Sequence, residues 1–466
     1  MAQSSEQQKI QLFEQTPVPK AVMTLAVPTI LSSLVMVLYN LADTYFVGML
    51  NDPIQNAGVT LAAPLLLAFN AVNNLFGVGS SSMMSRALGR KDYEMVRRGS
   101  AFGFYCALAF SIAFSIGYTV FSGPMLTLLG ATEETTAATA GYLFWTVSLG
   151  AAPAILNVVM AYLVRSEGAA LHASIGTMSG CILNMVLDPF FVLPWGLNMG
   201  AAGAGLATFI SNCVACLYFF ILLFVKRGNT FVSVNPRKFR FDRQIALEVF
   251  RVGIPASIQN LLNVTGMTIL NNFTASYGSD AVAAMGIAQK LNQIPMQIAL
   301  GMSQGVMPLY SYTYASQNYT RMRKSVLFTI RISLSFALAV SVGYFIFSEE
   351  LVRLFMDNPD IVAYGSRFLH GMCLGIVFLS TDFTAVGIFQ ATGQGEKAFV
   401  FAILRKIVLE IPALFILNWL FGVYGLAYAQ LTAEVVLAVA AVIVVVRMFQ
   451  KLERPGVRAG GESPRT

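Results

Sequence analysis

Four oxygen-bearing side chains in the first half of the sequence have the chemistry of a cation site. Asp43 and Asp188 are carboxylates inside long apolar stretches. Asn184 precedes Asp188 by four residues, a spacing that puts both on one face of a helix, and Thr208 lies in the next apolar stretch. Their oxygens suit H⁺ or Na⁺ rather than thiophilic metals, and neighbouring carboxylates repel each other, which favours uptake of a cation. The alternative is that each Asp only hydrogen-bonds a neighbouring helix.

The apolar stretches that carry these residues define the fold class. Of 466 residues, 56% are hydrophobic and 11% are charged, whereas soluble domains have about 25% charged residues. A membrane-spanning helix needs about 20 apolar residues, and the sequence offers twelve such stretches. We therefore expect an all-α integral membrane protein with twelve transmembrane helices. The predicted spans are 20–47, 58–84, 99–122, 137–163, 172–194, 200–225, 247–275, 281–308, 325–347, 361–389, 398–420 and 423–446.

Basic residues predict the orientation of the chain. Lys and Arg concentrate in the N-terminal segment, in the 85–98 and 226–251 connections and in the C-terminal tail, and basic loops stay in the cytoplasm. We expect a multi-pass protein of the cytoplasmic membrane with both termini inside. The net charge of +7 then reflects this topology and attraction to lipid headgroups, so nucleic acid is not an expected partner.

The two sets of six predicted spans are an internal duplication. Gly89–Arg98 aligns with Ala315–Lys324, and Pro28 aligns with Pro255. Because six is even, both halves enter the membrane in the same direction, which predicts two lobes related by a pseudo-two-fold axis along the membrane normal, with the substrate between them. The predicted parts are an N-terminal lobe with a cytoplasmic linker at 1–235, a C-terminal lobe at 236–450 and a disordered cytoplasmic tail at 451–466.

Amide side chains in the second half predict a wet cavity. One face of the span 281–308 carries Gln289, Gln293, Gln297 and Gln304, and the preceding span carries Gln259 and Asn263. Hydrogen bonds between helices explain such amides nearly as well. A methionine in this region moulds to varied ligands, although core filling is its commoner role. The candidate substrate cavity comprises Asn40, Asn157, Gln259, Asn263, Gln289, Gln293, Met296, Gln297 and Asp382.

Charged residues also interrupt the predicted spans of the second half. Asp382 is a candidate for a second titrating site, and Glu410 and Glu434 lie in later spans. Arg405 and Lys406, like Arg367, fall near predicted span ends, where anchoring at the membrane interface accounts for them.

Enzymatic motifs are missing from the sequence. It contains no phosphate-binding GxxxxGK[ST] loop, no GxSxG elbow and no HExxH pair. Cys213 and Cys216 form a CxxC inside an apolar stretch, without histidines at metal-ligand spacing. We expect no enzyme and no cofactor, apart from H⁺ or Na⁺ as a coupling ion.

Several motifs resemble those of the multidrug and toxic compound extrusion (MATE) transporters, in particular their MepA-like bacterial branch. The resemblance covers residues 12–447 and rests on the duplication and on the stretches Phe13–Ala21, Asn74–Ser80, Ser85–Tyr93, Leu187–Pro189 and Gln390–Gly395. It implies a V-shaped pair of six-helix lobes that works by alternating access in a bacterial membrane. We expect a monomer to be functional, because a single chain already holds both halves of the cavity. It also implies export of cationic amphiphilic compounds in exchange for H⁺ or Na⁺.

The resemblance also implies roles for single residues. In members with a cation site in the first lobe, the ligands are an Asp in span 1, an Asn and an Asp one turn apart in span 5 and a Thr in span 6. The matching residues here are Asp43, Asn184, Asp188 and Thr208, and the bend in span 1 maps to Pro28. Other members use acids in spans 7 and 10, but span 7 has amides here. A flippase for lipids or lipid-linked oligosaccharides is the alternative function, although buried acids argue against it.

Overall fold

The computed structural model describes residues 5–453, which form helices joined by short connections and contain no strand. The all-α class predicted from the sequence is therefore confirmed. The first half comprises α1 (Ser5–Glu14), α2 (Val18–Gly48), α3 (Pro53–Val72), η1 (Asn73–Val78), α4 (Gly79–Gly89), α5 (Tyr93–Val120), α6 (Ser122–Leu128), α7 (Glu133–Leu143), η2 (Phe144–Leu149), α8 (Ala151–Ser166), α9 (Ala170–Val192) and α10 (Ala201–Val225). The second half comprises η3 (Pro236–Lys238), α11 (Arg243–Ala275), α12 (Ser279–Ala315), α13 (Tyr319–Ile346), α14 (Ser348–Arg353), α15 (Pro359–Ala391), α16 (Gly395–Ile403), η4 (Leu404–Glu410), α17 (Ile411–Phe421) and α18 (Val423–Leu452).

The predicted spans coincide with these helices. In residues 5–453, nine helices are long and apolar enough to cross a membrane, and the bent pair Glu133–Leu149 and Ala151–Ser166, with 53° between its halves, makes a tenth. The two remaining predicted spans, 281–308 and 398–420, correspond to α12 and to the series α16, η4 and α17, which carry more polar and charged residues. The predicted tail starts at 451, but α18 continues to Leu452; the rest of that prediction, from residue 454, lies outside the described residues.

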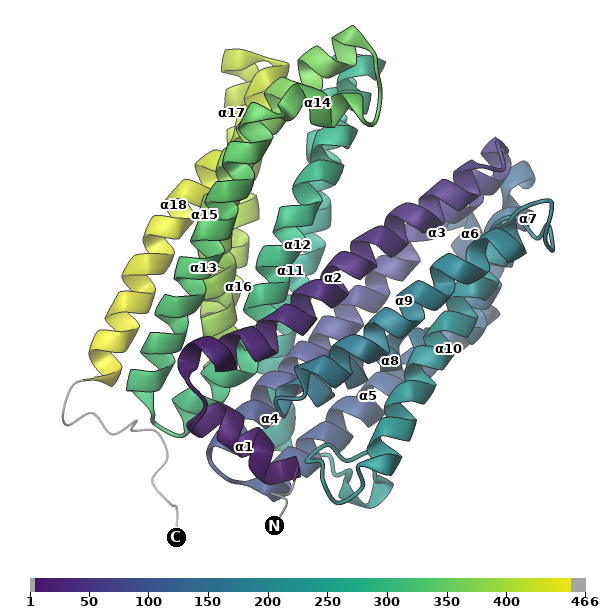
Figure 1. Cartoon of the computed structure of the whole chain (residues 1–466). Coiled ribbons are helices and arrows are strands. Elements are labelled where there is room, and N and C mark those ends of the chain that lie inside the picture. Colours follow the sequence, from purple (N-terminus) through teal and green to yellow (C-terminus); the bar gives the residue numbers. More distant parts are fainter. Residues whose placement is uncertain (1–4, 454–466) are drawn as a thin grey trace.

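The helices form two bundles that converge at one end and diverge at the other (Figure 1). The convergent end holds α1 and the N-terminal start of α2, whereas α6 and α7 of one bundle lie far from α14 and α17 of the other. Helix α2 packs on α9 in its own bundle and on α12 in the other, so it belongs to both. Helix α2 is therefore one of the elements that join the bundles, together with η1 and α4, which pack on α11 and α12.

Glycines let the two bundles approach closely at the convergent end. A Cβ at Gly253 of α11 would lie 2.0 Å from the Leu75 carbonyl oxygen of η1, and one at Gly305 of α12 would lie 2.8 Å from the Leu25 carbonyl oxygen of α2. Distances this short exclude any side chain unless the backbones move apart. The contact between the bundles thus depends on these positions lacking a side chain.

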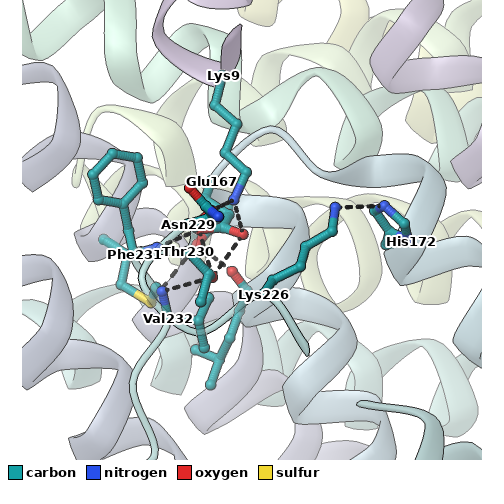
Figure 2. Close-up of polar contacts among 11 residues, drawn as sticks. Lys9, Glu167, His172, Lys226, Asn229, Thr230, Phe231 and Val232 are labelled. Carbon is teal, nitrogen blue, oxygen red and sulfur yellow. Dashed lines mark hydrogen bonds and ion pairs between the residues drawn. The ribbon is translucent and has the colours of Figure 1, made fainter. Parts of the chain in front are cut away.

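The N-terminal helix α1 is fixed to the first bundle by a buried ion pair (Figure 2). Lys9 Nζ lies 2.5 Å from Glu167 Oε1 and donates to the Asn229 carbonyl at 3.1 Å. Glu167 also accepts from the backbone N–H of Phe231 at 2.7 Å, and the Lys9 and Glu167 side chains are only 9% and 4% exposed. Removing one partner of such a pair leaves an uncompensated charge, so α1 is firmly held against the connection that follows α10.

The same segment is also fixed to the second bundle. The Arg321 guanidinium at the start of α13 donates to the backbone carbonyls of Phe13 at 2.6 Å and Leu12 at 3.2 Å. The Phe13 ring stacks on Tyr312 of α12, with 4.8 Å between ring centroids. Helix α1 therefore bridges both bundles across their convergent end, and the bundles cannot separate there without breaking these contacts.

Substituting Gly253 by Ala should destabilise this arrangement. The added methyl group overpacks the contact with Leu75, which costs about 1–3 kcal/mol, and should lower the melting temperature of the purified protein. Gly343→Ala is the matched control, because Gly343 also lies inside a helix and a Cβ there has no neighbour within 4 Å. Equal melting temperatures for the two variants would contradict the close contact.

Substituting Arg321 by Gln should release α1. Hydrogen bonds from a charged donor contribute about 1.5–3 kcal/mol each, so amide hydrogen exchange in residues 5–16 should accelerate at least about tenfold. Arg323→Gln serves as the control, because Arg323 is exposed and pairs with Glu453 at 3.1 Å instead. The bridging role of α1 is wrong if both variants keep the protection of the unmodified protein.

Candidate functional site

Three of the four predicted cation ligands form one hydrogen-bonded cluster. The Asn184 amide satisfies both neighbours when its nitrogen donates to Asp188 Oδ2 at 2.8 Å and its oxygen accepts from the Thr208 hydroxyl at 3.2 Å and the Thr208 backbone N–H at 3.1 Å. Asp188 is fully buried and Asn184 is 2% exposed. Asn184 and Asp188 thus share one face of α9 as predicted, and Asn184 links this pair to Thr208 of α10.

Small residues allow α9 and α10 to bring these side chains together. A Cβ at Gly180 of α9 would lie 3.0 Å from the Ala215 methyl group and 3.2 Å from the Ser211 carbonyl oxygen of α10. Close approach at small residues is typical of helix pairs in membranes. It shortens the distance that the Asn184 and Thr208 side chains must span.

The fourth predicted ligand, Asp43, comes from α2. It is partly buried, and its carboxylate lies close enough to Asp188 for the two to repel each other. Asp43 Oδ1 and Asp188 Oδ1 are both buried, and neither has a hydrogen-bond partner among residues 5–453. Two unsatisfied carboxylate oxygens inside a protein are costly, and a bound H⁺ or Na⁺ would satisfy them.

Sequence reasoning missed Tyr39, which lies one turn before Asp43 on α2. Its hydroxyl contacts the Thr208 side chain, and its ring lines the same cavity as Asn184 and Thr208. The spacing of Tyr39 and Asp43 on one face of the helix was the available signal. Pro28, the predicted hinge, lies inside α2, which continues without a break around it; bending there remains a prediction.

The predicted cavity residues divide between two cavities. The first, of about 290 Å³, lies within the first bundle and is lined by Asn40, Asn157, Asn184 and Thr208 among others. The second, of about 130 Å³, lies between the bundles, where Gln259, Asn263 and Met296 face Asn74 of η1. Gln304, from the predicted polar face of the span 281–308, also lines the second cavity, as does Gln390, which was not predicted to do so.

Other predicted cavity residues make contacts between helices. Gln289 donates to Asn271 Oδ1 of α11 at 3.1 Å, the alternative that the sequence left open. Gln293 and Gln297 are partly buried on the same helix, α12, but line neither of the two cavities described above.

Asp382 lies in an ion-paired cluster. Its Oδ2 atom is 3.6 Å from Arg405 Nη1, and Arg405 Nε is 2.7 Å from Glu434 Oε1. Arg405 and Lys406 are only 3% and 7% exposed. The prediction that these two residues anchor the chain at the membrane interface is therefore wrong, because π-helical η4 turns both of them into the bundle.

Known proteins similar to this chain are also helical membrane proteins, and they identify its family. Residues 28–190 and 255–416 match the profile of the MatE family. Multidrug export protein MepA of Staphylococcus aureus (strain MRSA252) is 35% identical over 447 residues, which is 96% of this chain and 97% of that protein. Its namesake from Staphylococcus saprophyticus is 33% identical over 450 residues, with 96% of this chain and 97% of that protein covered.

Solved structures support the same assignment. The outward-facing conformation of a multidrug resistance MATE family transporter of the MOP superfamily matches with a TM-score of 0.90 at 26% identity, covering 95% of this chain and 98% of that one. A MATE structure in the bent conformation matches with a TM-score of 0.87, covering 96% and 98%. The chain belongs to the MatE family, and the predicted MATE fold is confirmed.

Replacing Thr208 by Val should weaken cation binding without unfolding the protein. The change removes a hydroxyl that contributes about 1 kcal/mol through its hydrogen bond to Asn184, so about fivefold more H⁺ or Na⁺ should be needed for half-maximal thermal stabilisation. Thr177→Val is the control, because Thr177 lines the same cavity but donates to its own helix, at the Ala173 carbonyl, 3.0 Å away. If the two variants need the same concentration, Thr208 is not a ligand.

Proposed function

We propose that this chain is a multidrug efflux antiporter, which exports cationic amphiphilic compounds in exchange for H⁺ or Na⁺. The observation that carries the proposal is the first-bundle cluster of Asp43, Asn184, Asp188 and Thr208. It combines two unsatisfied carboxylate oxygens with amide and hydroxyl groups at the wall of a polar cavity. The relatives named multidrug export protein support drugs as the substrate class.

The distribution of basic residues supports the orientation. The basic 85–98 connection and the linker after α10 lie near α1, at the convergent end (Figure 1). Under the positive-inside rule this end faces the cytoplasm. The bundles then diverge toward the outside, so the structure corresponds to an outward-open state, in which α1 closes the cytoplasmic side. Both bundles are in one chain, which supports a monomer as the working unit.

Coupling follows from the charge of the first-bundle cluster. Asp43 and Asp188 repel each other when both are ionised, and a bound H⁺ or Na⁺ removes that repulsion. Asp43 lies on α2, which also packs on α12, so relaxation around Asp43 moves the contact between the bundles. An ion can shift the equilibrium between two states only by binding one of them more tightly. In this mechanism the outward-open state binds the ion and releases the drug.

Return to the inward-open state requires α1 to detach. Contacts of Lys9 with Glu167 and of Arg321 with Phe13 tie opposite bundles to the same short helix. Opening the cytoplasmic side separates these anchors, so one of them must break in each cycle. The strength of this bridge therefore sets part of the barrier between the two states.

Transport in liposomes tests the proposal directly. Protein reconstituted with a fluorescent organic cation inside should move it under an imposed Na⁺ or H⁺ gradient. Asp43→Asn and Asp188→Asn should each reduce gradient-driven transport at least about tenfold, because each removes a charge that binds the ion. Asp280→Asn is the matched control, an acid on an exposed helix end.

The outcomes separate the candidate functions. Gradient-driven transport that survives both substitutions would refute the proposed coupling site. An absence of cation transport under either gradient, together with lipid scrambling in the same liposomes, would favour a flippase instead.

A further inference from the structure

The second bundle contains five buried charged residues that the coupling scheme above does not use. We call them the second-bundle charge cluster: Asp382 of α15, Arg405, Lys406 and Glu410 of η4, and Glu434 of α18. Their exposed fractions are 1%, 3%, 7%, 6% and 0%. Charges at this depth in a membrane protein are costly and are kept where they have a function.

Arg405 is the centre of this cluster. Its guanidinium lies between two carboxylates, 3.6 Å from Asp382 and 2.7 Å from Glu434, and stacks over the Phe383 ring at 5.1 Å from the ring centroid. The Phe383 ring of α15 and the Glu434 carboxylate of α18 both contact the guanidinium. Helices α15 and α18 together therefore fix the position of the Arg405 side chain.

A second pair completes the cluster beside Arg405. Lys406 Nζ lies 2.7 Å from Glu410 Oε1. Consecutive residues of a regular α-helix point about 100° apart, whereas the π-helical turn of η4 buries Arg405 and Lys406 together. Helix α11 covers this pair with Gly266, where a Cβ would lie 3.1 Å from Lys406 Nζ and 3.3 Å from Glu410 Oε1.

The charges of the cluster almost balance. Three carboxylates face two basic groups, so one negative charge remains among these side chains. The groups that act electrostatically on Glu434 are the other four members of the cluster: Arg405, Asp382, Glu410 and Lys406.

The two bundles thus treat their buried acids differently. Among residues 5–453, neither Asp43 nor Asp188 forms a salt bridge with a basic side chain, and each has an unsatisfied oxygen. In the second bundle, Asp382 and Glu434 also have oxygens without a hydrogen-bond partner, but Arg405 lies within ion-pair distance of both carboxylates.

We propose that Arg405 is a tethered cation, whose guanidinium occupies the position between Asp382 and Glu434 that a free H⁺ or Na⁺ would otherwise take. The second bundle then keeps a constant charge through the cycle, and the coupling ion acts at the first bundle. This inference rests on the proposed antiport. It refines that proposal by assigning the binding of the coupling ion to the first bundle alone.

The test removes the tether and asks whether a free ion replaces it. In a D43N/D188N background, which lacks the first-bundle site, Arg405→Gln leaves Asp382 and Glu434 without their cation. Folded protein should then bind Na⁺ or protons more strongly than the unfolded chain, so stability should rise with added Na⁺ or with falling pH. Under one of these conditions, we expect the melting temperature of this variant to rise by several degrees more than that of the D43N/D188N parent.

Two further variants keep the test decisive. Arg405→Lys retains the positive charge and should show no response to either ion. If Arg405→Gln does not fold, R405Q/E434Q removes one charge of each sign and should restore folding, with a smaller response to ions.

Two outcomes would overturn the proposal. One is an Arg405→Gln variant that responds to Na⁺ and pH no more than its parent. The other is a D43N/D188N parent that is itself stabilised by Na⁺ or acid in a manner abolished by Asp382→Asn, since the native cluster would then bind free ions. Both outcomes are melting temperatures of purified protein and involve no transport. They can therefore be distinguished from a failure of the liposome experiment, which tests antiport.

Discussion

The cost of burying a carboxylate without a cation governs this structure. In the first bundle, Asp43 and Asp188 come within repelling distance of each other, and the protein supplies only an amide and a hydroxyl beside them. In the second bundle, Asp382 and Glu434 surround Arg405. Within residues 5–453, the two acids of the first bundle therefore have no basic side chain as a partner, whereas Asp382 and Glu434 share Arg405. This difference gives a duplicated chain two unequal halves.

The remaining architecture connects the first-bundle cluster to the contact between the bundles. Asp43 lies on α2, the helix that packs on both α9 and α12. Glycines such as Gly253 hold the bundles together at the end bridged by α1, and the opposite ends diverge (Figure 1). A change in charge at one acid can thus alter the packing of a helix shared by the two bundles.

Much of this arrangement was predictable from local patterns. The apolar stretches predicted the helices, and the four-residue spacing of Asn184 and Asp188 predicted their shared face. The surroundings of Arg405 were not predictable in the same way, because η4 departs from α-helical periodicity and turns two consecutive basic residues inward. The bridge formed by α1 also escaped prediction, since Arg321 and Phe13 are 308 residues apart and their contact uses a backbone carbonyl that no side-chain pattern reveals.

The most direct test of the central claim is whether a cation at the first bundle changes the distance between the two bundles. Spin labels on cysteines at Leu128 and Leu354, which are 82% and 80% exposed near the divergent end, would report that distance by pulsed electron paramagnetic resonance, once the five native cysteines are replaced. We predict that Na⁺ or mild acid shifts the distance distribution in the otherwise unmodified protein, and that Asp43→Asn and Asp188→Asn each abolish the shift. A distribution that ignores both ions, or that responds equally in these variants, would contradict the account.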